Sequence, residues 1–163
     1  MPEILKQASI SLRITRIISE TPDTKTFILE PVVGQTIQYK AGQFLTFLFT
    51  KANGEEERRN YSISSTPIDN DPLKITVKRI PNGEYSRKLI DTVKEGTELI
   101  TTGASGFFTL PEEMNAYDQF VFFAAGSGIT PVYALIKTVL HDHPSAYIVL
   151  IYSNRSVGHS IFY

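Results

Sequence analysis

A glycine turn between an apolar run and an amphipathic segment constrains this chain most. Residues 120–125 are continuously apolar, which predicts a fully buried strand, and the run stops at Gly126-x-Gly128. Thr130 and Pro131 then open a segment with a helical apolar pattern, and proline is well tolerated in a first helical turn. Such a turn can cradle a phosphate, because glycine admits close approach and the free N–H groups favour negative charge. The pattern favours a nucleotide site, and a plain tight turn between core elements is the alternative.

The residues before position 115 have a different character. Short β-rich runs alternate there with turn signals such as Pro22-Asp23 and Asn53-Gly54. We expect a short helix over residues 86–93 and a small antiparallel barrel whose strands cover residues 9–18, 26–30, 44–50, 58–64, 73–79 and 98–102. The acidic run at residues 55–57 is expected at a solvated hairpin tip.

After residue 115 the order becomes strand, helix, strand, over residues 119–125, 132–141 and 146–152. This order predicts one βαβ unit with a right-handed crossover. The expected architecture is an all-β antiparallel barrel of Greek-key type over residues 1–115, followed by a partial α/β parallel-sheet unit over residues 116–163.

One βαβ unit is too little to cover both faces of a nucleotide-binding sheet. We therefore expect the chain to be a fragment of a longer protein. The apolar runs at residues 121–123 and 148–151 would then favour self-association. The alternative is a natural short domain whose open sheet packs on the barrel or on a partner.

Composition narrows the function classes. The chain has 163 residues, no cysteine and a formal net charge of −1, so it carries no disulfide and no cysteine-ligated cluster. It lacks a basic stripe that would bind nucleic acid and an apolar run long enough to span a membrane. Its N-terminus lacks the pattern of a signal peptide, and we expect a cytoplasmic protein. His141 and His143 have metal-like spacing, but we expect them at a helix C-terminus and expect no metal site.

Candidate ligand-binding residues gather in the barrel half. Arg59 and Tyr61 alternate on one strand and so share a face. An arginine can hold a phosphate while a neighbouring ring stacks on a heterocycle, although an exposed arginine beside a half-buried tyrosine is the ordinary alternative. Lys78 and Arg79 end a later strand, and the turn at Gly83 leads to the N-terminus of the short helix.

Six short motifs follow one another in an order typical of one family: Ala41-Gly42-Gln43-Phe44, Arg59-x-Tyr61-Ser62-x-x-Ser65, Val77-Lys78-Arg79, Gly83-x-x-Ser86, Gly103-x-x-Gly106-x-Phe108 and Gly126-x-Gly128-x-Thr130-Pro131. In this order the chain resembles the ferredoxin–NADP reductase superfamily, in particular bacterial flavodoxin/ferredoxin reductases and oxygenase reductase components. The resemblance implies that Arg59 binds the flavin phosphates, that Tyr61 stacks near the flavin and that Ser62 bonds near its reacting nitrogen. Parity places Ser62 on the opposite face, so the strand must twist or end there.

The resemblance also assigns residues to both cofactors. The FAD site would include Val77, Lys78, Arg79, Gly83, Tyr85 and Ser86. Gly126, Gly128, Thr130 and Pro131 would meet the nicotinamide nucleotide, with Thr130 nearest the reacting rings. The implied activity is hydride transfer from NAD(P)H to FAD, then transfer of single electrons to a ferredoxin, flavodoxin or oxygenase. As a fragment, the chain alone is expected to be a poor reductase. Tyr61, Ser62 and Thr130 are the candidate residues around this chemistry, which the cofactors themselves supply.

Two finer expectations concern the nucleotides. FAD is favoured over FMN, because the turn at residues 83–86 offers phosphate donors beyond Arg59. NADPH is favoured with NADH left open, because Ser153 and Arg155 end the second strand of the βαβ unit without a carboxylate, and arginine suits a 2′-phosphate. The alternative functions are a flavin- or nucleotide-binding module that transfers no hydride, and an empty barrel that serves as an interaction domain.

Overall fold

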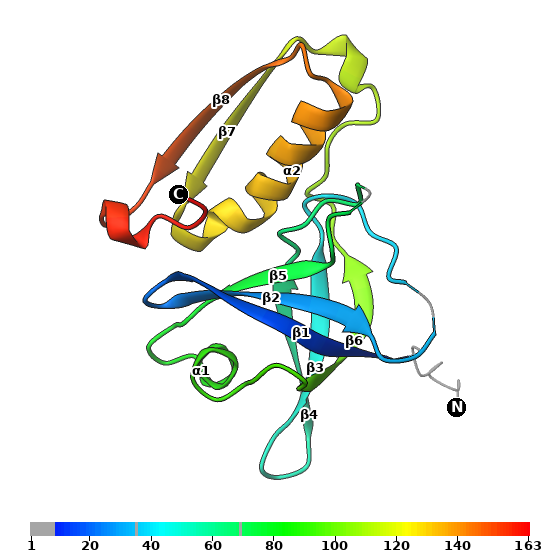
Figure 1. Cartoon of the computed structure of the whole chain (residues 1–163), viewed down its shortest axis with the longest axis vertical. Coiled ribbons are helices and arrows are strands. Elements are labelled where there is room, and N and C mark those ends of the chain that lie inside the picture. The colour runs from blue at the N-terminus through cyan, green and yellow to red at the C-terminus, as the bar shows by residue number, and fades with distance from the viewer. Residues whose placement is uncertain (1–8, 35, 69) are drawn as a thin grey trace.

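The computed structural model describes residues 9–34, 36–68 and 70–163. Six antiparallel strands form one sheet in the order β4-β3-β6-β1-β2-β5. Their bounds are β1 (Ile10–Thr21), β2 (Thr24–Pro31), β3 (Phe44–Thr50), β4 (Glu56–Ser62), β5 (Lys74–Lys78) and β6 (Glu98–Ser105). A bridge between Ile63 and Ile75 joins the end of β4 to β5 and closes the sheet (Figure 1). The expected antiparallel barrel is confirmed.

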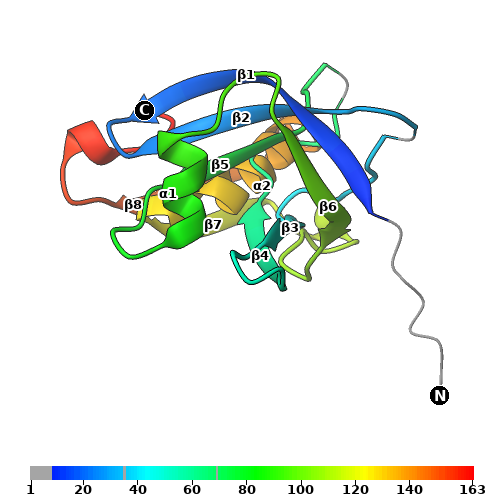
Figure 2. The same ribbon diagram turned by 90° about the horizontal axis from the view of Figure 1, so that it is seen from below.

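The barrel core follows from the alternation along its strands. In β3, Leu45, Phe47 and Phe49 are buried and the residues between them are half-buried. The helix α1 (Glu84–Asp91) adds Tyr85, Leu89 and Ile90 to the same core. Figure 2 shows α1 beside the turn between β1 and β2. There the Lys25 ammonium donates to the Ile90 carbonyl at 2.6 Å, which places a positive charge at the helix C-terminus.

The second part of the chain is one parallel βαβ unit, as expected. The strands β7 (Gln119–Ala125) and β8 (Tyr147–Ser153) pair in parallel, and α2 (Ile129–Asp142) connects them above the barrel in the view of Figure 1. One sheet face packs on α2 through Phe122. On the other face Phe123 is 71% exposed and Ile151 54% exposed. The expected self-association of this face stays a prediction.

Several element boundaries differ from the expectation. Both helices begin earlier than expected, at Glu84 and at Ile129, because each starts directly after its glycine turn. The turn before α2 is the short 3₁₀ element η2 (Gly126–Gly128), and η1 (Met114–Ala116) and η3 (Val157–His159) are two more such elements. The strand β4 begins at Glu56, so part of the acidic run lies within the strand. It ends at Ser62, two residues before the expected end, and the parity argument required the strand to twist or end at this residue.

The C-terminus of α2 carries the two histidines, as expected. The His143 N–H caps the helix on the Val139 carbonyl at 2.8 Å, and His141 Nδ1 lies 2.7 Å from the Asp142 carboxylate. Within residues 9–34, 36–68 and 70–163, no helix is long and apolar enough to cross a membrane.

Gly42 lies where the barrel meets the βαβ unit. Its φ is +90°, and an added Cβ would lie 1.9 Å from the Phe108 carbonyl oxygen and 3.0 Å from Leu135 of α2. The neighbouring Ala41 packs into the apolar cluster under α2. A side chain at position 42 would therefore collide with the Phe108 carbonyl and press against Leu135 of α2.

Candidate nucleotide-binding site

A cavity of about 740 Å³ opens between the barrel, the start of α1 and the start of α2. It brings together predicted residues from both parts of the chain: Arg59, Tyr61, Ser62, Val77, Lys78, Arg79, Gly83, Tyr85, Ser86, Thr130 and Arg155. Four predicted residues lie outside its lining, namely Gly126, Gly128, Pro131 and Ser153, and Ser127 lines it in place of the two glycines that flank it.

The end of β4 forms one wall of the cavity. Arg59 and Tyr61 both line it, as their shared strand face requires, and Ser62 joins them as the last residue of the strand. Tyr61 is half-buried, and its ring centroid lies 6.0 Å from that of Phe47. Burial raises the pKa of the Tyr61 phenol to about 12, with the nearby Arg59 charge acting in the opposite direction. Tyr61 therefore presents a neutral aromatic surface at physiological pH.

Arg59 is a cation whose present contacts can be exchanged for a contact with a ligand. Its guanidinium carbon lies 5.1 Å from the centroid of the Tyr85 ring, a cation–π contact, and it pairs with the Glu57 carboxylate. Glu57 also pairs with Lys51 at 2.9 Å, and the Lys51 hydrogen bond is the main influence that lowers the pKa of Glu57. Because the Arg59 side chain is 45% exposed, an anion in the cavity can reach it.

The first turn of α1 supplies backbone donors to the cavity. The first helical hydrogen bond runs from the Arg87 N–H to the Gly83 carbonyl at 3.1 Å, so the N–H groups of residues 84–86 have no helical partner. The Ser86 hydroxyl accepts from the Ile80 N–H and donates to the Gly83 carbonyl, both at 3.2 Å. Ser86 therefore braces this turn with its side chain, and its contribution to a ligand is its backbone N–H.

The predicted residues at the end of β5 have their side chains engaged elsewhere. Arg79 binds both oxygens of Asp91 at 3.0 and 3.1 Å, and Lys78 pairs with Asp23 at 3.5 Å. The Asp91 hydrogen bond raises the pKa of Arg79. Val77 is buried in the core, so its contribution to the cavity comes from its backbone. Neither of these ion pairs was predicted from the sequence.

The βαβ unit contributes the opposite wall. Gly126 has a φ of +49°, and the Tyr152 hydroxyl holds the turn by donating to the Gly126 carbonyl at 3.0 Å. The same hydroxyl accepts from the Ile161 N–H at 3.1 Å. Tyr152 was not predicted from the sequence, because its place near the turn follows from its position opposite Ala124 in the parallel strand pair.

Two hydroxyls at the cavity are buried without a partner. Within the part of the chain that the structure describes, the Tyr85 hydroxyl and Thr130 Oγ1 have no hydrogen-bond partner. Buried polar groups in proteins are almost always hydrogen-bonded, so these two atoms fit a ligand that offers them partners. Together with Arg59, the α1 N-terminus and the Tyr61 ring, they suit a ligand that has an aromatic ring system and phosphates.

Comparison with known proteins identifies the class to which this arrangement belongs. Residues 11–110 match the model of a family described as an oxidoreductase FAD-binding domain, and residues 122–163 match an oxidoreductase NAD-binding domain. The first match spans more than half of the chain, which therefore belongs to the oxidoreductase FAD-binding domain family. The resemblance to ferredoxin–NADP reductases and oxygenase reductase components is confirmed.

Relatives and solved structures match nearly the whole chain. The ferredoxin reductase component of 3-ketosteroid-9-alpha-monooxygenase from Rhodococcus rhodochrous is 34% identical over 156 residues, which cover 94% of this chain and 43% of that protein. The glycine betaine monooxygenase reductase subunit from Pseudomonas aeruginosa is 34% identical over 152 residues, 93% of this chain and 41% of that protein. The structure of phthalate dioxygenase reductase has a TM-score of 0.81 at 25% identity and covers 96% of this chain and 47% of its own. The chain thus spans less than half the length of these proteins.

Proposed function

We propose that this chain holds FAD in the cavity and receives NADPH at the turn before α2. The complete protein then acts as an NAD(P)H-dependent flavoprotein reductase that passes single electrons to a ferredoxin, a flavodoxin or an oxygenase. The observation that carries this proposal is that one cavity is lined by Arg59 and Tyr61 of the FAD-binding domain and by Thr130 of the NAD-binding unit. FAD and NADPH bound at these residues would lie next to each other in one cavity.

The residues at the cavity have distinct roles in this proposal. FAD supplies the chemistry when bound, because it accepts a hydride from a nicotinamide and gives up electrons one at a time. Arg59 and the free N–H groups of residues 84–86 bind its phosphates, and Tyr61 orients its ring. The Ser62 hydroxyl and the unpartnered Thr130 hydroxyl offer hydrogen bonds near the reacting atoms.

Two finer points belong to the same proposal. The first turn of α1 lies beyond Arg59 in the same cavity, and this second group of donors supports FAD over FMN. Arg155 also lines the cavity and follows the end of β8 without a nearby carboxylate in the sequence Ser153-Asn154-Arg155. This position supports NADPH over NADH, because an arginine favours the charge of a 2′-phosphate. The relatives named as reductase components of monooxygenases support an acceptor protein as the partner.

The variant Arg59→Ala tests the proposal, with Arg58→Ala as its matched control. Arg58 is the adjacent exposed arginine; it pairs with Glu56 and does not line the cavity. Loss of a charge-assisted contact costs about 1.5–3 kcal/mol, so we expect Arg59→Ala to weaken FAD binding roughly 10- to 150-fold. Titration of FAD fluorescence measures this, and Arg58→Ala should bind FAD like the parent chain. Equal affinity in Arg59→Ala and Arg58→Ala would remove Arg59 from the site.

Hydride transfer needs a separate measurement. We expect NADPH, added without oxygen to the chain loaded with FAD, to bleach the visible flavin absorbance. Mass spectrometry of the cofactor that copurifies should find FAD, and FMN as the sole species would contradict the assignment. A chain that binds FAD tightly but is never bleached would contradict hydride transfer by this chain and favour the alternative of a flavin-binding module.

A further inference from the structure

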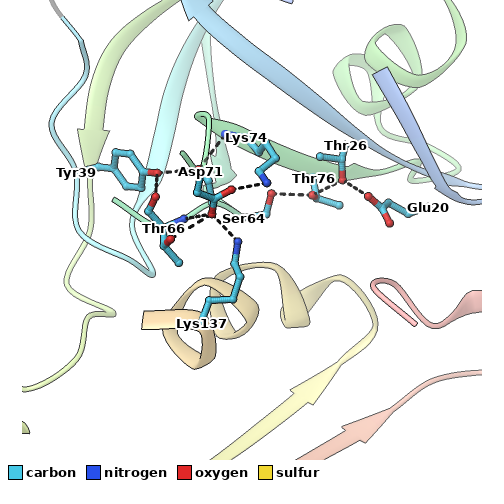
Figure 3. Close-up of polar contacts among 10 residues, drawn as sticks. Glu20, Thr26, Tyr39, Ser64, Thr66, Asp71, Lys74, Thr76 and Lys137 are labelled. Carbon is cyan, nitrogen blue, oxygen red and sulfur yellow. Dashed lines mark hydrogen bonds and ion pairs between the residues drawn. The ribbon is translucent and has the colours of Figure 1, made fainter. Parts of the chain in front are cut away.

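A partly buried ion cluster joins the helix of the NAD-binding unit to the FAD-binding barrel. Lys137 of α2 donates to the carboxylate of Asp71 at 2.6 Å, and Asp71 lies in the loop between β4 and β5 (Figure 3). The two side chains are 25% and 17% exposed. Within residues 9–34, 36–68 and 70–163, this is the one salt bridge that connects the two parts of the chain.

The barrel side of this cluster is rigidly held. Asp71 also accepts the Thr66 N–H at 2.8 Å and pairs with Lys74 at 2.5 Å. The Tyr39 hydroxyl donates to the Thr66 carbonyl at 2.8 Å. Thr66 follows Ser62, which lines the cavity, by four residues. Asp71 is therefore fixed to the segment of chain that continues from the β4 wall of the cavity.

On the helix side of the ion cluster, Lys137 lies on the same face of α2 as Thr130. Thr130 and Lys137 are seven residues apart, which places them on one face of α2 and separates them by about 10 Å along its axis. Thr130 lines the cavity at the start of the helix. Ala41 of the barrel packs into the apolar cluster that includes Val132 and Leu135 of α2, and such apolar contacts lack direction. The ion pair is thus suited to fix how the helix is oriented on the barrel.

We infer that Lys137 is a positioning residue: its ion pair with Asp71 sets the angle at which α2 presents Thr130 to the cavity, and so the approach of nicotinamide to flavin. This inference rests on the proposed reductase function. A tilt of about 10° around the ion pair moves Thr130 by roughly 2 Å, given a separation of about 10 Å. A misplacement of about 1 Å can slow a reaction roughly 100-fold, so small tilts are enough to matter.

The test compares Lys137→Met with Lys74→Met. Both lysines bind the same carboxylate, but Lys74 belongs to β5 of the barrel, so its loss leaves the link between the two parts intact. The chain loaded with FAD is measured in three ways: FAD affinity, hydrogen–deuterium exchange of the α2 peptide, and the rate of flavin bleaching by NADPH. Lys137→Arg, which keeps the charge, is the rescue variant.

We expect Lys137→Met to leave FAD affinity unchanged, to raise exchange in α2 and to slow bleaching by about tenfold or more. Lys74→Met should leave the exchange and the rate as in the parent chain, and Lys137→Arg should restore both. Equal effects of the two methionine variants, or no effect of Lys137→Met on exchange, would overturn the inference. A parent chain that binds no FAD would instead refute the proposed function, and the exchange measurement would still decide whether Lys137 orients α2.

Discussion

Asp71 should make the free energy of unfolding of this protein depend on pH between about 4 and about 2. Burial by itself raises the pKa of Asp71, but hydrogen bonds from Lys137, Lys74 and the Thr66 N–H outweigh it and lower the pKa to about 2, from 3.8. The folded state therefore favours the charged carboxylate. The resulting stability is fully present above a pH of about 4 and is lost as the pH falls through about 2.

The size of this contribution follows from the two pKa values. A decrease from 3.8 to about 2 corresponds to about 2 kcal/mol of folding free energy at neutral pH, of which roughly half is left at pH 3. The Asp71 side chain is 17% exposed, so solvent screens it little. The variant Asp71→Asn keeps the shape of the side chain and removes its charge.

Urea unfolding of the parent chain and of Asp71→Asn at pH 7 and at pH 3 measures this contribution. We expect a difference in unfolding free energy of about 2 kcal/mol at pH 7 and about half of that at pH 3. Other carboxylates with lowered pKa values, such as Asp23 and Glu98, are present in both proteins and cancel in the comparison. Glu112→Gln, at an exposed carboxylate, is the control for the removal of one negative charge. A difference that is the same at both pH values would refute a charge-based role for Asp71.

Two further predictions concern the junction and the nucleotide. Gly42→Ala should destabilise the fold by about 2–4 kcal/mol, because it adds both backbone strain and a Cβ 1.9 Å from the Phe108 oxygen. Gly54→Ala, with a φ of +85° but nothing within 4 Å of the added Cβ, should cost about 1 kcal/mol in the same denaturation assay, and equal losses would contradict the steric argument. Arg155→Ala should remove any preference of the chain for 2′-phospho-AMP over AMP in calorimetric titrations, a loss of about 1.5–3 kcal/mol, and an unchanged preference would exclude Arg155 as the phosphate ligand.

Local patterns predicted the elements well. The apolar run before Gly126 predicted β7, and the β-rich run at residues 44–50 between turn signals predicted β3. These signals are contained within a few residues, because strand and helix periodicities are local properties of a sequence. The start of α1 was misplaced by two residues, since the helix begins directly after the turn at Gly83.

The polar contacts of the site were harder to predict. Tyr152 and Gly126 are 26 residues apart, and Lys137 and Asp71 are 66 apart. Nothing in the local sequence connects such partners, because the strand order and the docking of α2 bring them together. The pairing of Arg59 with Glu57 could have been predicted from the sequence, since residues two apart on a strand share a face.

The ion pairs around the cavity explain why Arg59 rather than Arg79 suits a phosphate ligand. Arg79 and Asp91 bind each other directly, so recruiting Arg79 to a ligand would deprive Asp91 of that partner. Glu57, by contrast, retains Lys51 at 2.9 Å when Arg59 turns towards an anion. When Arg59 changes its partner from Glu57 to a phosphate, no carboxylate is left without a cation. The free energy spent in breaking the Arg59–Glu57 pair is therefore small. Both arginines line the same cavity, and the partners of each decide which one can change its contact.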